Sequence, residues 1–158
     1  DWSHSRLIPD ILESIINDKK LTLRNPKSIR PWQFILDPLY GYLLLAIKLH
    51  NKGNTYAEAW NFGPNKKNLK NVEWITNKMF DLWGKEKYFK KSKKIFHEEN
   101  YLSLDSRKSN KKLFWKPSYD INTSLIKIIA WHKAFKNKKN MNEFSKKQIM
   151  EFMKFKNI

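Results

Sequence analysis

The chain has 158 residues, enough for one modest domain, and its hydrophobic content of 41% excludes an intrinsically disordered protein. It contains no cysteine, which excludes a disulfide framework and a cysteine-based zinc site. The formal net charge is +17, but only four of the 32 basic residues are arginine, and the lysines are spread along the chain. Nucleic-acid readers favour arginine for bidentate contacts, so we interpret the charge as a solvated surface that attracts nucleic acid only non-specifically.

The chain shows no targeting segment. Its first ten residues lack the basic and apolar stretches of a signal peptide, and its most apolar window, residues 42–47, is too short to cross a bilayer. We therefore expect a cytoplasmic protein without a membrane partner. Because the chain starts at Asp1 rather than at methionine, we also expect a fragment or split piece of a longer protein.

The first predicted elements are a helix and a short strand. Residues 6–18 carry aliphatic side chains at helical spacing, and Pro9 falls in the first turn, where proline is tolerated. Residues 21–23 begin a strand, and Asn25-Pro26 after them is a turn signal.

A second strand and a second helix follow. Residues 32–36 are aromatic and β-branched, which predicts a strand. Asp37-Pro38 is a helix start, with Asp37 as the capping residue, and the helix is expected to end near Gly53.

The rest of the chain alternates between strand and helix patterns. The predicted strands are residues 57–63, residues 88–89 and a part of residues 97–105. The predicted helices are residues 72–83, 106–113, 121–136 and 143–155. This alternation predicts an α/β fold, or α+β for the isolated chain, in one domain over residues 1–158 whose residues 140–158 form a C-terminal helical extension.

Several site types are absent from the sequence. The four glycines, at positions 41, 53, 63 and 84, do not form a GxGxxG loop, and no tyrosine is followed by lysine at the fourth place. The residues therefore predict no dinucleotide site in this chain. No pair of histidines has convincing ligand spacing with a carboxylate, so we predict no metal site.

Two polar side chains stand out as candidates for ligand binding. Arg30 precedes Pro31, which holds it in an extended segment beside an aromatic residue, and this arrangement suits a flat, anionic ligand. The alternative is an ion pair of Arg30 with Asp37 or Glu58. Asn61 falls where a strand meets a loop, and its amide can donate and accept, but it is equally well explained as a turn residue. Six tryptophans are expected in the core because their rings bury large areas: Trp32, Trp60, Trp74, Trp83, Trp115 and Trp131.

A series of motifs over residues 1 to about 135 resembles one family. The motifs are DWSxxRLIPD, LRNPxxIRPWQ, DPLxGYLLLA, WNFGP, HExxYLxLD and LxWKP, in this order. This order resembles the C-terminal half of the CDP-glucose 4,6-dehydratase family, which is similar to the dTDP-glucose and GDP-mannose dehydratases among the extended short-chain dehydrogenase/reductases. RNPxxIRPWQ is the specific part. Phe114 departs from the pattern, because the family usually carries glycine before this tryptophan.

The resemblance implies a fold and an activity. It implies the C-terminal substrate-binding lobe of such an enzyme, with the Rossmann core missing or incomplete. In the family, NAD takes hydride from C4 of the sugar, water leaves across C5–C6, and hydride returns to C6, a lyase reaction of deoxysugar biosynthesis for lipopolysaccharide O-antigen. NAD and the catalytic residues belong to the N-terminal half, so the resemblance implies that this chain alone holds no catalytic residue and is inactive.

The resemblance also implies a set of residues that bind the nucleotide-sugar. Arg30 matches the arginine on the diphosphate, the segment from Arg6 runs beside the nucleotide, and the strand of Leu21 and Leu23 flanks the base. The full set is Arg6, Leu7, Ile8, Pro9, Leu21, Leu23, Arg24, Arg30, Asn61, His97 and Glu98. Arg6 and Arg24 are otherwise explained as surface residues, and His97 as a turn residue.

Three functions remain open at this point. The first is the nucleotide-sugar-binding part of a CDP-glucose 4,6-dehydratase. The second is a non-catalytic module that holds a nucleotide-sugar, alone or on a separate Rossmann half. The third is a basic nucleic-acid-binding domain. In the first two cases the chain, when expressed alone, is expected to expose an apolar face and to aggregate or be partly disordered.

Overall fold

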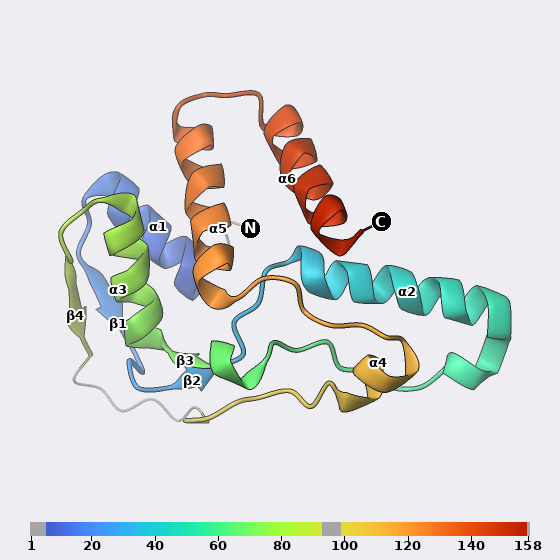
Figure 1. Cartoon of the computed structure of the whole chain (residues 1–158). Helices are drawn as coiled ribbons and strands as arrows, with labels where there is room; N and C mark the ends of the chain where they lie inside the picture. The colour runs from blue at the N-terminus through green and yellow to red at the C-terminus, as the bar shows by residue number, and fades with distance from the viewer. Residues whose placement is uncertain (1–5, 93–98, 158) are drawn as a thin grey trace. The chain divides into compact units, whose positions relative to one another are not determined.

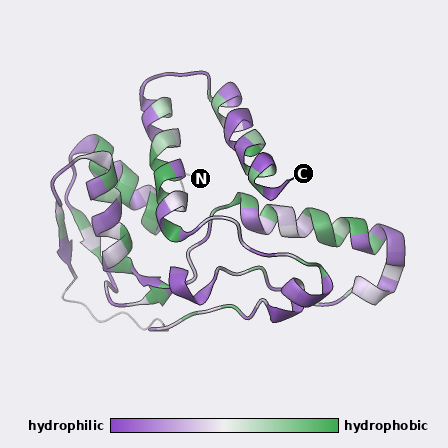
Figure 2. Ribbon diagram, viewed as in Figure 1, coloured by the Kyte–Doolittle hydropathy of each residue, from purple (hydrophilic) through white to green (hydrophobic). Residues whose placement is uncertain are grey.

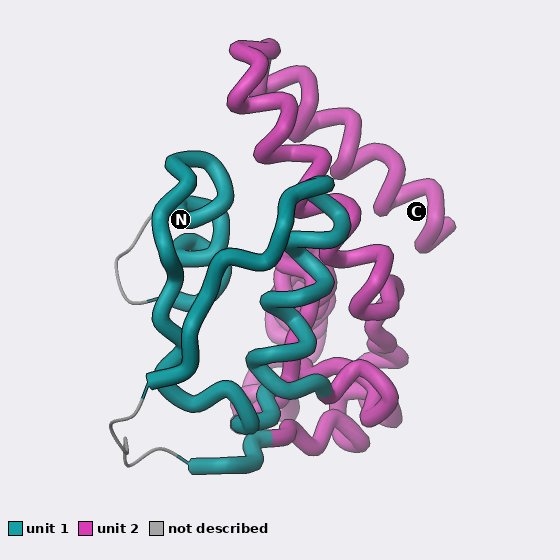
Figure 3. The backbone as a smooth tube through the Cα atoms, turned by 90° about the vertical axis from the view of Figure 1, so that its left-hand side faces the viewer, with its two compact units in different colours: residues 1–30, 70–102 teal, residues 31–69, 103–158 magenta. Residues whose placement is uncertain are grey.

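The computed structural model describes residues 6–92 and 99–157, shown in Figure 1. The chain divides into two compact units, coloured separately in Figure 3. Unit 1 comprises residues 1–30 and 70–102, and unit 2 comprises residues 31–69 and 103–158. Within the described residues, no helix combines the length and the apolar character needed to cross a membrane.

The described part of unit 1 consists of two helices and four short strands. Its elements are α1 (Leu7–Asn17), β1 (Leu21–Leu23), β2 (Ile29–Arg30), β3 (Lys70–Asn71), α3 (Val72–Trp83) and β4 (Phe89–Lys91). The strand β1 pairs with β4 in parallel, and β2 pairs with β3 in antiparallel orientation. The helices α1 and α3 contact each other. Their apolar sides are buried and form the core of the unit with β1, through Ile11, Leu12, Ile15, Leu23, Ile75, Met79 and Phe80.

The ends of α3 are set by local sequence. The side chain of Asn71 accepts a hydrogen bond from the backbone N–H of Trp74 at 2.7 Å, which satisfies one of the unpaired donors of the first turn. Gly84 ends the helix in the left-handed conformation, with φ of 85°, and its N–H bonds back to Phe80 and Asp81. The predicted helix at residues 72–83 is confirmed.

Unit 2 is built from helices. Its elements are α2 (Leu36–Lys52), the 3₁₀ helices η1 (Gly53–Tyr56) and η2 (Lys66–Asn68), α4 (Arg107–Lys112), α5 (Ile121–Lys136) and α6 (Met141–Lys156). A core cluster of Phe62, Leu113 and Trp115 packs against α2. Trp115 is fully buried, and its indole N–H donates to the carbonyl oxygen of Asp37 at 2.9 Å.

The helices α5 and α6 pack against each other. Trp131 donates through its indole N–H to the hydroxyl of Ser145 at 3.0 Å, and Lys127 pairs with Glu151. Phe152 is the one side chain of α6 that is buried, and its ring contacts those of Tyr40 and Tyr119. The attachment of α6 therefore combines polar contacts with one aromatic anchor.

Three predicted strands are wrong. Residues 31–34 are irregular, and α2 begins at Leu36, so residues 32–36 form no strand. Residues 57–63 are also irregular. Of residues 97–105, the described part contains a single bridge, between Tyr101 and Ile29. Aromatic and β-branched residues favour a strand only where a neighbouring strand can pair with them. Among the described residues, segments 32–36 and 57–63 have no such neighbour, and the third segment meets β2 at a single position.

The predicted roles of Asp37 and of the tryptophans also need correction. Asp37 lies inside the first turn of α2 and is fully buried. Its carboxylate accepts the backbone N–H of Ser118 at 2.7 Å and does not cap its own helix. Of the six tryptophans expected in the core, Trp115 is fully buried and the other five are partly exposed.

Candidate functional site

The guanidinium of Arg30 is held by backbone carbonyl groups of unit 1. Its Nη1 donates to the carbonyl oxygen of Glu99 at 2.7 Å and to that of Ile29 at 3.0 Å. The segment that carries Glu99 is bonded to β2, since Ile29 donates to Asn100 at 2.8 Å and accepts from Leu102 at 3.1 Å. Arg30 is thus a half-buried cation whose orientation is fixed by main-chain acceptors.

The carboxylates considered as partners of Arg30 have contacts within unit 2. Glu58 pairs with Lys108 at 2.6 Å and with Lys112 at 2.8 Å, and these hydrogen bonds lower the pKa of Glu58 to about 2. The carboxylate of Asp37 accepts from Ser118. Burial raises the pKa of Asp37 above its ordinary value, although the hydrogen bonds from Ser118 oppose this.

The predicted residues of α1 lie at its N-terminus. Arg6 is the exposed N-cap residue, and its carbonyl oxygen accepts from the N–H of Asp10 at 2.9 Å. Leu7, Ile8 and Pro9 form the half-buried first turn. These side chains are accessible to a ligand at this end of the helix.

The predicted residues on β1 are placed differently. Leu21 and Leu23 are buried, with Thr22 exposed between them. A ligand beside this strand would therefore meet its backbone and Thr22, while the two leucines support it from the core. Arg24 follows the strand and is exposed.

Three predicted residues remain, and only Asn61 can be placed. Asn61 belongs to unit 2, where it is exposed and its carbonyl oxygen accepts from the hydroxyl of Ser109. His97 and Glu98 lie outside the described residues. The structure therefore brings Arg6–Pro9, Leu21, Leu23, Arg24 and Arg30 into one unit, and it places Asn61 in the other.

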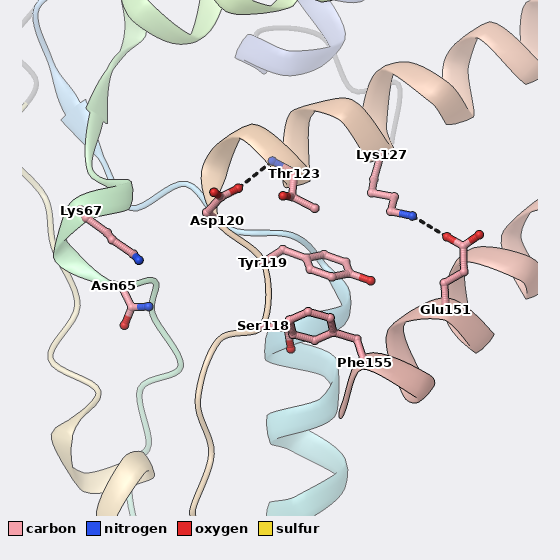
Figure 4. A pocket seen from close by; sticks show the side chains of 9 residues that line it. All are labelled: Asn65, Lys67, Ser118, Tyr119, Asp120, Thr123, Lys127, Glu151 and Phe155. Carbon is pink, nitrogen blue, oxygen red and sulfur yellow. Dashed lines mark hydrogen bonds and ion pairs between the residues drawn. The ribbon is translucent and has the colours of Figure 1, made fainter. Parts of the chain in front are cut away.

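Unit 2 contains a cavity of about 630 Å³ that the sequence did not indicate (Figure 4). Its lining comes from the loop at η2, the segment before α5, and the facing sides of α5 and α6: Asn65, Lys67, Ser118, Tyr119, Asp120, Thr123, Lys127, Glu151 and Phe155. The rings of Tyr119 and Phe155 are 5.4 Å apart, and Figure 4 shows Lys127 directed toward Glu151. An aromatic wall with carboxylate, amide and ammonium groups suits a ligand with many hydroxyl groups.

Hydrogen bonds and burial shift the pKa values of two groups in this cavity. The carboxylate of Asp120 accepts from the backbone N–H of Thr123 at 2.8 Å, which caps α5 and lowers the pKa of Asp120. Burial raises the pKa of the Tyr119 phenol above its ordinary value. A phenol is protonated at neutral pH in any case, so this hydroxyl can donate.

A second cavity of about 500 Å³ joins two sequence motifs. It is lined by residues of the WNFGP loop and of the YLxLD segment, and the N–H of Gly63 donates to the hydroxyl of Ser106 at 2.7 Å. Asp105 and Arg107 form an ion pair at 2.6 Å, which lowers the pKa of Asp105 to about 2. The order of the motifs was the available signal for this cavity, but it did not show that the two segments meet.

Neither a dinucleotide site nor a metal site is found among the described residues. The parallel ladder of β1 and β4 is three residues long, and the separated glycines provide no phosphate-binding loop. Residues 6–92 and 99–157 hold no group of three His, Asp or Glu side chains that could bind a metal ion. The described residues therefore provide no phosphate-binding loop for NAD.

Comparison with known sequences gives one extended match. No family model matches the chain. The chain is 42% identical over 154 residues to CDP-glucose 4,6-dehydratase of Salmonella typhimurium, which covers 97% of this chain and 43% of that enzyme, in its C-terminal part. The resemblance to CDP-glucose 4,6-dehydratase is confirmed. The chain spans less than half of the length of this relative.

Solved structures of similar fold come from the extended dehydratases and epimerases. A dTDP-glucose 4,6-dehydratase of Bacillus anthracis in complex with NAD matches 81% of this chain and 39% of its own, with 23% identity and a TM-score of 0.68. A dTDP-glucose 4,6-dehydratase of Streptomyces venezuelae with NAD bound matches 85% of this chain and 40% of its own, with 18% identity and a TM-score of 0.71. A UDP-glucuronic acid 4-epimerase of Bacillus cereus in complex with UDP-glucuronic acid and NAD matches 77% of this chain and 37% of its own, with 20% identity and a TM-score of 0.65.

These structures establish the fold alone. The predicted fold class is confirmed: helices and short strands as in the C-terminal lobe of the extended short-chain dehydrogenase/reductases, with an incomplete Rossmann core. Among the described residues, the parallel ladder is limited to β1 and β4.

Proposed function

We propose that this chain binds a nucleotide-sugar, CDP-glucose or a close analogue, and contributes this binding to an NAD-dependent CDP-glucose 4,6-dehydratase. The observation that carries the proposal is the fixed guanidinium of Arg30, held by the carbonyl oxygens of Ile29 and Glu99. It stands in RNPxxIRPWQ, the specific part of the sequence resemblance. A guanidinium with a set orientation is suited to a diphosphate, because its planar donors can bond two phosphate oxygens.

Other predicted residues would add contacts to the ligand. Arg6 and Arg24 are exposed cations of the same unit and add charge for the phosphates. The first turn of α1 offers an apolar surface for a pyrimidine, and the carboxylate of Glu98, which lies outside the described residues, is the proposed acceptor for the ribose hydroxyls. The hydride chemistry of NAD would be supplied by another polypeptide segment, since the described residues provide no phosphate-binding loop for this cofactor.

Calorimetric titration of the full chain with CDP-glucose tests the binding proposal. Removing a charged hydrogen-bond donor costs about 1.5–3 kcal/mol, so Arg30→Ala is expected to weaken binding by about 10- to 100-fold. Arg30→Lys keeps the charge but loses the planar donors of the guanidinium, so its affinity is expected to lie between those of the wild type and Arg30→Ala. Arg107→Ala is the matched control, because it removes an exposed arginine of unit 2. Equal affinities of the wild type and Arg30→Ala would refute the proposal.

Complementation tests the contribution to catalysis. The full chain is mixed or coexpressed with the remaining part of the Salmonella typhimurium enzyme, and conversion of CDP-glucose is followed by chromatography of the CDP-sugars. Turnover only in the presence of both parts is the expected result. Binding without turnover under any complementation would instead identify a non-catalytic nucleotide-sugar-binding module.

A further inference from the structure

A cavity of unit 2 has the volume of a ligand site and uses none of the residues proposed for the nucleotide-sugar. This is the cavity of about 630 Å³ in Figure 4. Small-molecule sites in proteins have volumes of about 300–1,000 Å³. All described residues that line it belong to unit 2, whereas Arg30 belongs to unit 1. The side chains of this lining, rather than Arg30, therefore decide which ligand fits it.

The charged groups of the cavity balance one another. Two lysines and two carboxylates line it: Lys67, Lys127, Asp120 and Glu151. Lys127 pairs with Glu151. The pKa of Asp120 is lowered by its hydrogen bonds with Thr123 and further by the positive charge of Lys67. A ligand with a net charge would meet as many like charges as opposite ones, and an ion that leaves water without a partner is costly. The lining therefore favours a neutral ligand.

Two aromatic rings form the apolar part of the lining. The rings of Tyr119 and Phe155 lie 5.4 Å apart between centroids, at an interplanar angle of 64°. Ring contacts with Phe34 at 5.6 Å and Phe152 at 5.7 Å fix Tyr119, whereas Phe155 is 61% exposed and keeps much of its ring available to a ligand. The face of an aromatic ring carries partial negative charge, so it attracts the polarised C–H groups of a saturated ring.

The polar groups near these rings can both donate and accept hydrogen bonds. The side chain of Asn65 makes no capping hydrogen bond at η2. In Figure 4 it extends from the loop before η2, and the hydroxyl of Tyr119 points toward α6. An amide and a phenol each offer a donor and an acceptor, as a sugar hydroxyl does. A ligand with several hydroxyl groups and an apolar ring face matches this combination.

We propose that this cavity binds a neutral saccharide that is not linked to a nucleotide. The C–H face of a pyranose ring would stack on Phe155, and its hydroxyl groups would bond to Tyr119, to Asn65 and to the charged groups. The volume of about 630 Å³ corresponds to about 20 water molecules of about 30 Å³ each, which leaves room for one or two pyranose rings.

A bound saccharide would also strengthen the attachment of α6. Figure 2 shows this helix as a mixture of hydrophilic and hydrophobic residues, and Phe152 is its one buried side chain. A ligand between Phe155 and Tyr119 adds a contact from α6 to the segment before α5. Because a ligand that binds only the closed arrangement stabilises it by mass action, opening of α6 becomes rarer as saccharide is added.

Saturation-transfer NMR of the full chain with methyl β-D-glucopyranoside tests the proposal. A neutral ligand of about a dozen non-hydrogen atoms is expected to bind with a Kd on the order of 1 mM. Phe155→Ala removes the stacking ring and Tyr119→Phe removes only the hydroxyl, and each is expected to weaken binding by about 3- to 10-fold. Met150→Ala is the matched control, since Met150 is 69% exposed on the same helix and does not line the cavity. Glucuronate and protonated glucosamine are expected to bind at least about fivefold more weakly, because they carry a charge.

Hydrogen exchange of the backbone amides gives a second readout. At a saccharide concentration of about five times the Kd, exchange through opening of residues 141–156 should slow by about sixfold in the wild type. At the same concentration, Phe155→Ala should show a clearly smaller effect, because less of it is bound. A merely structural role of Phe155 would not make this protection depend on the saccharide.

Each result decides the proposal. It is overturned by the absence of saturation transfer, by tighter binding of either charged relative, or by equal affinities of the wild type, Phe155→Ala and Tyr119→Phe. Titrations of two variants separate it from the nucleotide-sugar proposal. Arg30→Ala should keep the wild-type affinity for the methyl glucoside, and Phe155→Ala should keep that for CDP-glucose. Loss of both affinities in Phe155→Ala, with an unchanged circular dichroism spectrum, would assign the cavity to the nucleotide-sugar and overturn the proposal of a separate saccharide.

Discussion

Replacement of Gly41 by alanine tests the packing between α2 and the segment that follows it. A Cβ at this position would lie 2.5 Å and 2.6 Å from two ring carbons of Phe62. Phe62 is only 7% exposed, and its ring meets that of Trp115 at 5.2 Å between centroids, so it has little room to move. Alanine gains about 1 kcal/mol in helix propensity, whereas overpacking of a core costs about 1–3 kcal/mol. We therefore expect Gly41→Ala to lower the free energy of unfolding by about 1 kcal/mol.

Urea denaturation followed by circular dichroism measures this effect. Leu43 and Ile47 on α2 are 64% and 56% exposed. The Leu43→Lys/Ile47→Lys background removes these apolar side chains, so that association does not distort the transition. In the additional background Phe62→Ala, which removes the ring atoms that the new Cβ would meet, Gly41→Ala is expected to be neutral or stabilising by up to about 1 kcal/mol. If Gly41→Ala stabilises the chain that retains Phe62, or if the two substitutions act additively, the reasoning from this contact is wrong.

Three further predictions concern strain, pH and association. Phe114 has φ of 54° and is 82% exposed, so Phe114→Gly should relieve left-handed strain. The free energy of unfolding, measured by urea denaturation, should rise by about 0.5–1 kcal/mol. A decrease in this free energy, as expected for Lys111→Gly within α4, would contradict the prediction. Burial raises the pKa of Asp37, so the folded state binds more protons than the unfolded state above about pH 4, and stability falls as pH rises through this window. Asp37→Asn removes this dependence and should therefore be more stable relative to the wild type at pH 7 than at pH 4. If the difference in stability between the variant and the wild type does not change with pH, Asp37 is not the group responsible. The wild-type chain alone should associate in light scattering, and Leu43→Lys/Ile47→Lys should reduce its mass; a sharp cooperative melt of a monomeric wild type would argue otherwise.

The helices were predictable from sequence because their signals are local. The helices α3 and α5 have the predicted bounds, residues 72–83 and 121–136, since each begins after a residue whose side chain accepts from the first turn, Asn71 or Asp120. The end of α3 follows from Gly84, which adopts the left-handed conformation without strain. The residues that produce the amphipathic pattern and those that cap a helix are close to one another in the chain, so both signals can be read from a short stretch of sequence.

The wrong strands have a common physical reason. Residues 32–36 and 57–63 have strand-like composition, but a strand depends on pairing with a segment elsewhere in the chain, which composition does not reveal. Asp37 shows the same limit at a single residue: its sequence context predicts a cap, whereas its carboxylate accepts from Ser118, far away in sequence.

The site was predictable only in part. The Pro31 that follows Arg30 indicated an extended segment, and the structure places Arg30 on β2. The backbone acceptors that hold its guanidinium, above all Glu99, could not be inferred because they lie in a distant segment. The cavities of unit 2 were missed for the same reason, since each forms only where separate segments come together.

The single aromatic anchor of α6 has a consequence for how this helix can evolve. Phe152, fixed between Tyr40 and Tyr119, is the one buried side chain of the helix, and Met150 beside it is exposed. Substitutions should therefore be tolerated at exposed positions such as Met150, and much less at Phe152 or at Ser145 and Glu151, which bond to α5. The exposed side of this helix is a natural place in unit 2 for lineage-specific substitutions.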